Sequence, residues 1–199
     1  MSTAEIASII SDFDIFTQKT VQTSVLGTIE TSYKPIAPVV QNHLQFLIPA
    51  DKDNYIRLDI QLYVRGKLVS GSGNYVDVTD HTGVVNNLLH SLFSQCAVVL
   101  NGTTITQSGE HYNYRSYLEN LLTYGIDAAA THLTNAYWFS DNGEMMTCEP
   151  TTAVVTAVTN RGFITRWVRL STSKELQLFG RLHSDLFKVP LVLLPGVSL

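Results

Sequence analysis

The chain has 199 residues, which suits one full-sized domain and is too short for two ordinary ones. Apolar residues make up 45% and charged residues 15%, so the sequence can fill a core and leaves a weakly charged surface, as in subunits that bury much of their exterior. The net charge of -4 lacks the basic excess that phosphate binding requires, which argues against a dedicated nucleic-acid-binding module.

The first 24 residues are predicted to form an arm or a short helix. Apolar side chains recur at roughly helical spacing over residues 4–16, a pattern that fits a helix capping its own domain or an arm lying on a neighbour. The start has no basic segment followed by a long apolar run, and no stretch of the chain approaches the ~20 apolar residues of a membrane span. We therefore expect synthesis inside the cell, without secretion and without a membrane partner.

Three strands are predicted in the next part of the chain, at residues 25–33, 43–48 and 56–64. β-Branched residues dominate the first, and prolines follow the first two. In the third, apolar residues alternate strictly with polar ones, which predicts one face in the core and the other in water or at an interface. Residues 71–74 then form a flexible loop, because the strand-to-helix context of a phosphate-binding loop is missing.

A helix, a hairpin and a second helix are predicted in the middle of the chain. Apolar pairs four positions apart indicate a helix over residues 84–93, capped by Asp80 or Thr82. Two β runs over 96–106 are joined by an Asn-Gly pair, which is typical of a two-residue type I′ turn. Leucines and tyrosines over 114–122 return to helical spacing, which favours a helix whose apolar side faces the core and whose end is a left-handed glycine.

Strands are also predicted at residues 151–159, 163–170 and 175–186, from their β-branched and aromatic composition. Many short strands with a few helices, and no regular βαβ alternation, predict an all-β fold. We expect an antiparallel β-sandwich with short inserted helices, built as a single domain over residues 25–199.

The sequence shows no pattern typical of catalysis or metal binding. No two of the six histidines stand at the spacing that places paired ligands on one face, so no metal site and no cofactor is predicted. Glu110 and His111 are adjacent and are expected in a loop, while Cys96 and Cys148 are predicted to be separate buried thiols. A serine-nucleophile elbow is also missing, so we predict no enzymatic activity. Tyrosines around Arg115 are compatible with a surface for single-stranded nucleic acid, but their helical spacing favours the core.

Residues 89–95, 98–102 and 112–125 form three ordered motifs, and residues 174–187 form a fourth. Together they resemble the major capsid proteins of Maverick/Polinton elements and adintoviruses, and residues 55–65 are similar to the second or third strand of that family. The positions that carry the resemblance are Leu89, His90, Ser91, Leu92, Phe93, Asn101, Gly102, Tyr114, Arg115, Tyr117, Leu118, Glu119, Gly125, Gly180, Arg181, His183 and Asp185.

The resemblance implies a jelly roll, and in that family two jelly rolls stand side by side and three subunits form a pseudo-hexameric capsomer. The resemblance implies that this sequence is similar to the first jelly roll alone, as a fragment or as a truncated copy, and we do not expect the second jelly roll in it. We therefore expect a structural protein of a virion capsid that assembles with itself as a trimer and with other capsid proteins, and that meets nucleic acid only indirectly, as the packaged genome. The apolar run at 191–199 should pair with a neighbouring strand or chain.

Two other functions stay open from the sequence. Jelly rolls also serve as lectin-like scaffolds, and a loop such as residues 71–74 could hold a ligand in a domesticated binding module that forms no shell. A cupin-type enzyme shares the sandwich, but it needs inward-facing histidines and a carboxylate at short spacing.

Overall fold

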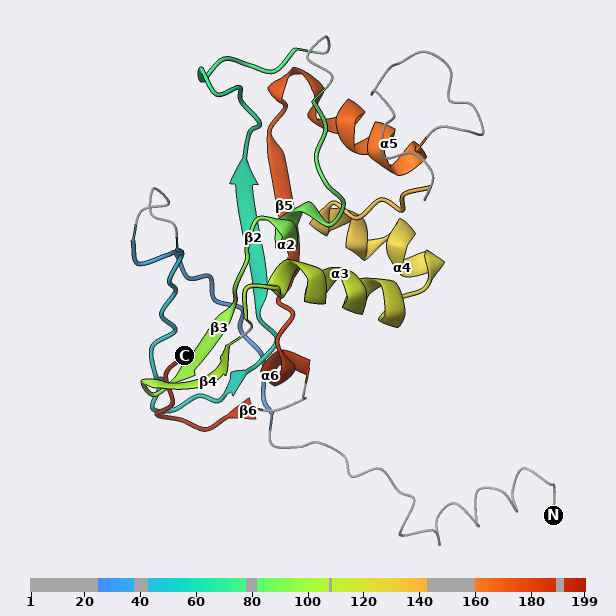
Figure 1. Ribbon diagram of the computed structural model, residues 1–199. Helices are drawn as coiled ribbons and strands as arrows, with labels where there is room; N and C mark the ends of the chain where they lie inside the picture. Colours follow the sequence, from blue (N-terminus) through green and yellow to red (C-terminus); the bar gives the residue numbers. More distant parts are fainter. Residues whose placement is uncertain (1–24, 38–42, 78–81, 108, 143–159, 189–191) are drawn as a thin grey trace, which may run out of the picture. The chain divides into compact units, whose positions relative to one another are not determined.

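The computed structural model describes residues 25–37, 43–77, 82–107, 109–142, 160–188 and 192–199 (Figure 1). The chain divides into two compact units, Met1–Phe46 and Leu47–Leu199. Every helix and strand of the described residues belongs to the second unit. The predicted strand at 151–159 lies outside the described residues. So does the predicted arm at 1–24, and its division from a domain at 25–199 stays a prediction.

The two strands predicted nearest the N-terminus are wrong. Residues 25–35 and 43–50 form no strand, and the side chains of Leu26 and Ile29 are almost fully exposed. A single backbone hydrogen bond of 2.8 Å, from the Ile36 amide to the Gln45 carbonyl, joins two described segments of the first unit. β-Branched composition favours a strand only where a partner offers a ladder of hydrogen bonds, and sequence composition alone does not supply that partner.

The strands of the described residues form three antiparallel pairs, and these pairs are nested in the sequence. β1 (Ile56–Arg57) pairs with β6 (Val192–Leu193), β2 (Gln61–Gly66) with β5 (Leu176–Arg181), and β3 (Ala97–Leu100) with β4 (Thr103–Gln107). The first strand thus pairs with the last, the second with the last but one, and the two middle strands with each other. The predicted antiparallel sheets are confirmed, but each is small, helices are mixed with them, and the predicted sandwich of two packed sheets stays a prediction.

The side chains of residues 56–64 alternate between buried or half-buried and exposed positions, as their alternating sequence predicted. Leu58 is buried, Ile60, Leu62 and Val64 are half-buried, and the intervening side chains are exposed. The run forms two short strands, β1 and β2, in place of one continuous strand. Its inward side chains belong to two cores, because Leu58 packs in one cluster while Leu62 and Val64 pack against another.

The predicted hairpin is confirmed at β3 and β4. Asn101 and Gly102 adopt φ angles of 46° and 79°, both in the left-handed region that a type I′ turn requires. The Asn101 side chain also accepts a hydrogen bond of 2.9 Å from the Ser198 amide, which ties the turn to the C-terminal segment.

The apolar C-terminal run finds its partners within the chain. Beyond β6, Ile48 and Leu199 exchange two backbone hydrogen bonds of 2.7 and 3.0 Å, and the Gly196 amide donates to the Asp51 carbonyl at 2.7 Å. The prediction that this run pairs with another strand or chain is confirmed by the pairing of β6 with β1. The partner strand belongs to the same molecule.

The helices are α2 (Leu88–Ser91), α3 (Tyr112–Thr123), α4 (Ile126–Ala130), α5 (Arg161–Leu170) and α6 (Asp185–Lys188), with short 3-10 turns η2 (His132–Ala136) and η3 (Ser171–Ser173). The α-helices α2 to α5 lie on one side of the β2–β5 pair, and α6 lies beyond the end of β5 (Figure 1). The core on this side consists of Leu89, Ala136, Tyr137, Leu170 and Leu178. A second cluster consists of Leu58, Val98 of the hairpin strand β3 and Phe187 of α6.

Three helical predictions need correction. The helix expected over 84–93 begins only after Asn87, because Asn87 adopts a left-handed backbone conformation with φ of 57° and cannot continue a helix from residue 84. Gly125 has φ of -85° and is not the left-handed C-cap expected of it. Residues 163–170 are part of α5 in place of the predicted strand, and the Asn160 side chain caps this helix by accepting a 3.1 Å hydrogen bond from the Phe163 amide.

Candidate functional site

Three of the sequence motifs meet in one group of polar side chains, here called the histidine cluster: His90, Tyr112, Arg115, Glu119 and His183. The first comes from α2, the next three from α3, and the last from the turn between β5 and α6. The rings of His90 and His183 pack edge to face with their centroids 4.5 Å apart. Residues far apart in the sequence therefore form one contiguous site in the second unit.

His90 is held neutral in the centre of this cluster. It is 1% exposed, and burial together with the neighbouring His183 lowers its pKa to about 3. Its Nδ1 lies 3.0 Å from the Tyr112 hydroxyl, which accepts a 3.3 Å hydrogen bond from the His183 amide. The Tyr112 hydroxyl therefore accepts from the His183 amide and shares a hydrogen bond with the neutral His90 ring. Burial also raises the pKa of Tyr112, which keeps this hydroxyl protonated.

Glu119 links the cluster to the surface. Its carboxylate accepts hydrogen bonds from His183 Nδ1 at 2.8 Å, Arg115 Nε at 2.8 Å and Lys188 Nζ at 2.7 Å. Burial alone would raise the pKa of Glu119, but these three donors outweigh it and lower the pKa to about 2. Burial lowers the pKa of His183 despite Glu119, so the contact between them is a hydrogen bond of a neutral imidazole at neutral pH.

A second polar network lies beside the first and fixes the start of α2. Asn87 is fully buried, donates from Nδ2 to the Ser116 hydroxyl at 3.0 Å, and accepts from Asn120 Nδ2 at 3.3 Å. Asn86 accepts from the Phe139 amide at 2.8 Å. These bonds to α3 account for the left-handed turn at Asn87, because tertiary hydrogen bonds replace the first turn of the predicted helix.

Gly180 lets β5 approach α2 closely. A Cβ atom at this position would lie 2.8 Å from Leu89 Cδ2 and 3.4 Å from His90 Nε2. A larger residue here would push on the core and on the histidine cluster at once. Its neighbour Arg181 turns the other way, donates to the Phe187 carbonyl at 2.6 Å and lies 3.7 Å from Asp59.

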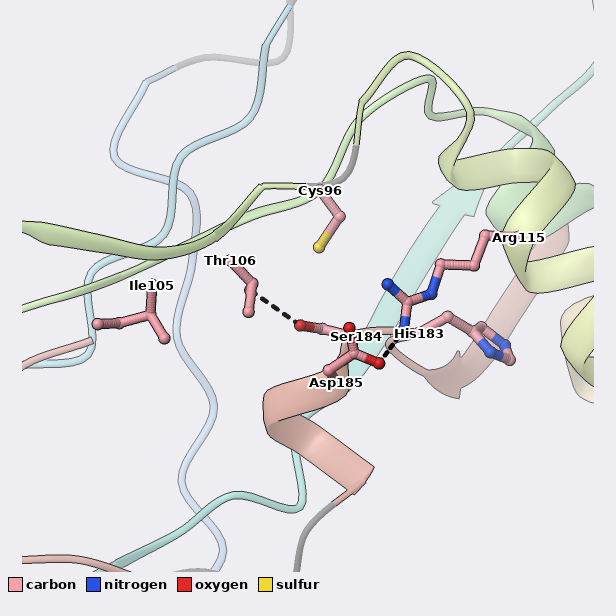
Figure 2. Close-up of a pocket in the computed structure, with 7 residues that line it drawn as sticks. All are labelled: Cys96, Ile105, Thr106, Arg115, His183, Ser184 and Asp185. Atoms are coloured by element: carbon pink, nitrogen blue, oxygen red, sulfur yellow. Dashed lines mark hydrogen bonds and ion pairs between the residues drawn. The ribbon is translucent and has the colours of Figure 1, made fainter.

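A polar hollow of about 250 Å³ opens beside the cluster, between the hairpin, α3 and α6 (Figure 2). Its walls include Cys96, Thr106, Arg115, Ser184 and Asp185. Figure 2 shows the Arg115 guanidinium reaching from α3 to the Asp185 carboxylate, and Thr106 bonded to Ser184 at 3.0 Å. Arg115 is therefore already paired with both Asp185 and Glu119, and these bonds raise its pKa. Burial raises the pKa of the Cys96 thiol, which is half-buried.

Arg166 is a buried cation that no sequence pattern singled out. Its side chain is 3% exposed and donates to the Val84 carbonyl at 3.0 Å, the Phe139 carbonyl at 2.8 Å and Asp141 at 2.8 Å. These bonds tie α5 to the segments on either side of it. The spacing of Asn160, Phe163 and Trp167 is compatible with a helix that would bury Arg166. The predicted element at 163–170 is a strand instead, and a strand gives no reason to expect this burial.

The apolar face of α3 points away from the core, contrary to the prediction. Tyr112, Ser116 and Asn120, four positions apart, are the buried residues of this helix. The opposite face carries Tyr114 and Leu118, both more than half exposed. Tyr117 is half-buried and stacks on Trp138 with ring centroids 4.9 Å apart. The aromatic residues of this segment therefore divide between the two faces.

The remaining sequence features lie in ordinary structural positions. The Ser91 hydroxyl donates hydrogen bonds to the backbone carbonyls of Asn86 and Asn87 in the preceding turn. Leu92 is the C-cap of α2, and Phe93 follows it. Glu110 and His111 lie in the turn before α3, as expected. Cys148 lies outside the described residues. No group of three histidine, cysteine, aspartate or glutamate side chains within the described ranges is arranged to hold a metal ion.

Comparison of this chain with known families, curated proteins and solved structures found no relative. No family model, curated protein or solved structure matches this chain. Within the part of the chain that the structure describes, the helices are all too short or too polar to cross a bilayer.

The members of the histidine cluster are buried or bonded to one another, and this limits what the cluster can do chemically. His90 is inaccessible to solvent, and the donors and acceptors of Tyr112, Glu119 and His183 point at one another. Such a set can hold elements together and can respond to protons, because two of its members are imidazoles.

Proposed function

We propose that this chain is a structural protein of the viral capsid type, a jelly-roll domain that associates with copies of itself into the capsomers of a shell. The observation that carries this proposal is the nested pairing of β1 with β6, β2 with β5 and β3 with β4. A jelly roll is a long antiparallel ribbon rolled up on itself, so its first strand pairs with its last and its middle strands form a hairpin. The three small sheets have the order expected of parts of such a ribbon.

The positions that carry the capsid resemblance support the proposal through their structural roles. Asn101 and Gly102 make the hairpin turn, Gly180 allows β5 to approach α2, and His90 and His183 join α2, α3 and the segment before α6. Each of these roles belongs to the architecture of the domain. A motif shared by shell-forming proteins is expected to preserve architecture, because their common task is packing.

Light scattering coupled to size-exclusion chromatography tests this proposal on the full chain. Loaded at increasing concentration, the protein should elute as a trimer or a larger closed assembly, because cyclic symmetry satisfies every copy of an interface. A single peak of monomer mass at every concentration would contradict a self-assembling function.

A binding module is the second candidate, and the polar hollow beside Arg115 is the observation that favours it. At about 250 Å³ the hollow is slightly smaller than the roughly 300–1,000 Å³ of typical ligand pockets. Its hydroxyl and carboxylate groups suit a sugar, as in lectin-like jelly rolls. Binding of one glycan class by the monomer on a glycan array would favour this function over shell assembly.

A further inference from the structure

The outward face of α3 and the residue that follows the helix carry a concentration of exposed apolar side chains, here called the α3 patch. Its members are Tyr114, Leu118, Leu121 and Leu122 of the helix and the C-cap residue Tyr124, which are 66%, 53%, 56%, 82% and 40% exposed. We infer that the α3 patch is a surface through which copies of this chain contact one another, patch against patch around the symmetry axis of their assembly. This inference rests on the proposed function and gives self-association a location.

The orientation of α3 is fixed by polar bonds, so the patch has no route into the core of its own unit. On the buried side, Ser116 and Asn120 bond to Asn87, and Arg115 and Glu119 hold the flank of the helix to α6 and His183. Rotating the leucines inward would break these bonds and expose their buried polar groups. A surface helix of a globular protein normally has the reverse arrangement, with its apolar stripe facing the core.

The area of the patch matches what an interface needs. Taking about 200 Å² for one fully exposed large side chain, the five residues leave roughly 600 Å² of surface open. Patches on monomers are usually about 300–600 Å², so this one lies at the upper end of that range. Two such patches in contact would bury roughly 1,200 Å², which is the lower limit for a stable, specific complex.

The chemistry of the patch favours its own copy as the partner. None of its five side chains is ionisable at neutral pH, so two patches can meet without like charges facing each other. At its edge Arg115 and Glu119 are paired with each other at 2.8 Å, which gives the polar rim that surrounds the apolar centre of an interface. A partner selected by charge would find no complementary group in the centre.

Two lysines placed in the patch provide the first test. The variant carrying Leu118→Lys and Leu121→Lys changes only exposed side chains, so it should fold with the circular dichroism spectrum of the parent. Its apparent association constant, measured by light scattering, should fall at least 100-fold, because each buried lysine would face another across the axis. Thr123→Lys is the matched control: it adds a charge to an exposed position of α3 outside the patch and should leave association unchanged.

The outcomes separate this inference from the proposed function. If the parent assembles and the double variant assembles equally well, copies meet elsewhere, so the inference is wrong while the shell function stands. If the parent remains monomeric, both fail. Loss of assembly in the double variant with retention in Thr123→Lys supports both.

Cross-linking gives a second and independent readout. Leu121→Cys, treated with a short bismaleimide in the assembled state, should yield covalent dimers well above the level of the parent, whose native cysteines set the background. Thr123→Cys should yield no more than the parent. Equal yields from Leu121→Cys and Thr123→Cys would overturn the patch-to-patch contact.

Discussion

Acidification should destabilise the fold through His90 at pH values well above those at which carboxylates titrate. The folded state holds the pKa of His90 at about 3, whereas an exposed histidine in the unfolded chain titrates near its ordinary value of 6.5. As the pH falls, His90 therefore binds a proton in the unfolded chain before it does so in the folded protein. This favours the unfolded chain and lowers the free energy of unfolding. His90 contributes full stability above pH 6.5 and progressively loses it as the pH falls towards 3.

The magnitude follows from the difference between the two pKa values. Between pH 7 and pH 5, uptake of this proton by the unfolded chain lowers the free energy of unfolding by about 2 kcal/mol. His183 adds to the fall, because burial lowers its pKa as well. The Glu119 carboxylate lowers the free energy of unfolding only at lower pH, because folding lowers its pKa from 4.5 to about 2.

Urea unfolding of the full chain at pH 7 and pH 5 measures this effect, with fluorescence of the buried Trp138 and Trp167 as the probe. His90→Gln removes the titrating group, so the loss of stability between the two pH values should shrink by about 2 kcal/mol relative to the parent. His132→Gln, which replaces an exposed histidine, should retain the parental loss. If His90→Gln lost as much stability on acidification as the parent, the buried neutral histidine would not be the cause.

Three further substitutions test the contacts around the site. Gly180→Ala places a methyl group 2.8 Å from Leu89 Cδ2 and should lower the free energy of unfolding by about 1–3 kcal/mol. Gly66→Ala, where no atom lies within 4 Å, should change it by less than about 0.5 kcal/mol, and equal effects in urea melts would contradict the close approach. Arg166→Met leaves two carbonyls and a carboxylate without their donor and should cost about 3 kcal/mol by calorimetry; a loss below about 1 kcal/mol would refute its structural role. Glu119→Gln should reduce the acid destabilisation between pH 4.5 and 2, because it removes the share that Glu119 contributes, and an unchanged acid limb in circular dichroism would exclude the lowered pKa of this carboxylate.

Features that depend on local sequence were predictable. The alternation over residues 56–64 and the hairpin around Asn101 and Gly102 follow from side-chain period and turn chemistry, which act between neighbours in the chain. The helix at α3 was predictable for the same reason. Its orientation was not, because a periodic pattern shows which face is apolar and does not show whether the core or another molecule covers it.

Features that depend on distant contacts could not be predicted. The left-handed turn at Asn87 exists because Ser116 and Asn120 bond to its side chain, and α3 is brought there only by folding. The helix at α5 was hidden because its buried positions include Gly162 and Arg166, which an apolar pattern does not count. His90 and His183 had no sequence spacing that suggested contact, although both lie within motifs that the capsid resemblance had marked.

Electron microscopy of the purified full chain tests the central claim most directly. A self-assembling capsid domain should give uniform closed rings or particles at high concentration, and the variant with lysines at Leu118 and Leu121 should give none under the same conditions. A field of monomers from the parent chain, at concentrations where light scattering also reports a single monomeric species, would contradict the account.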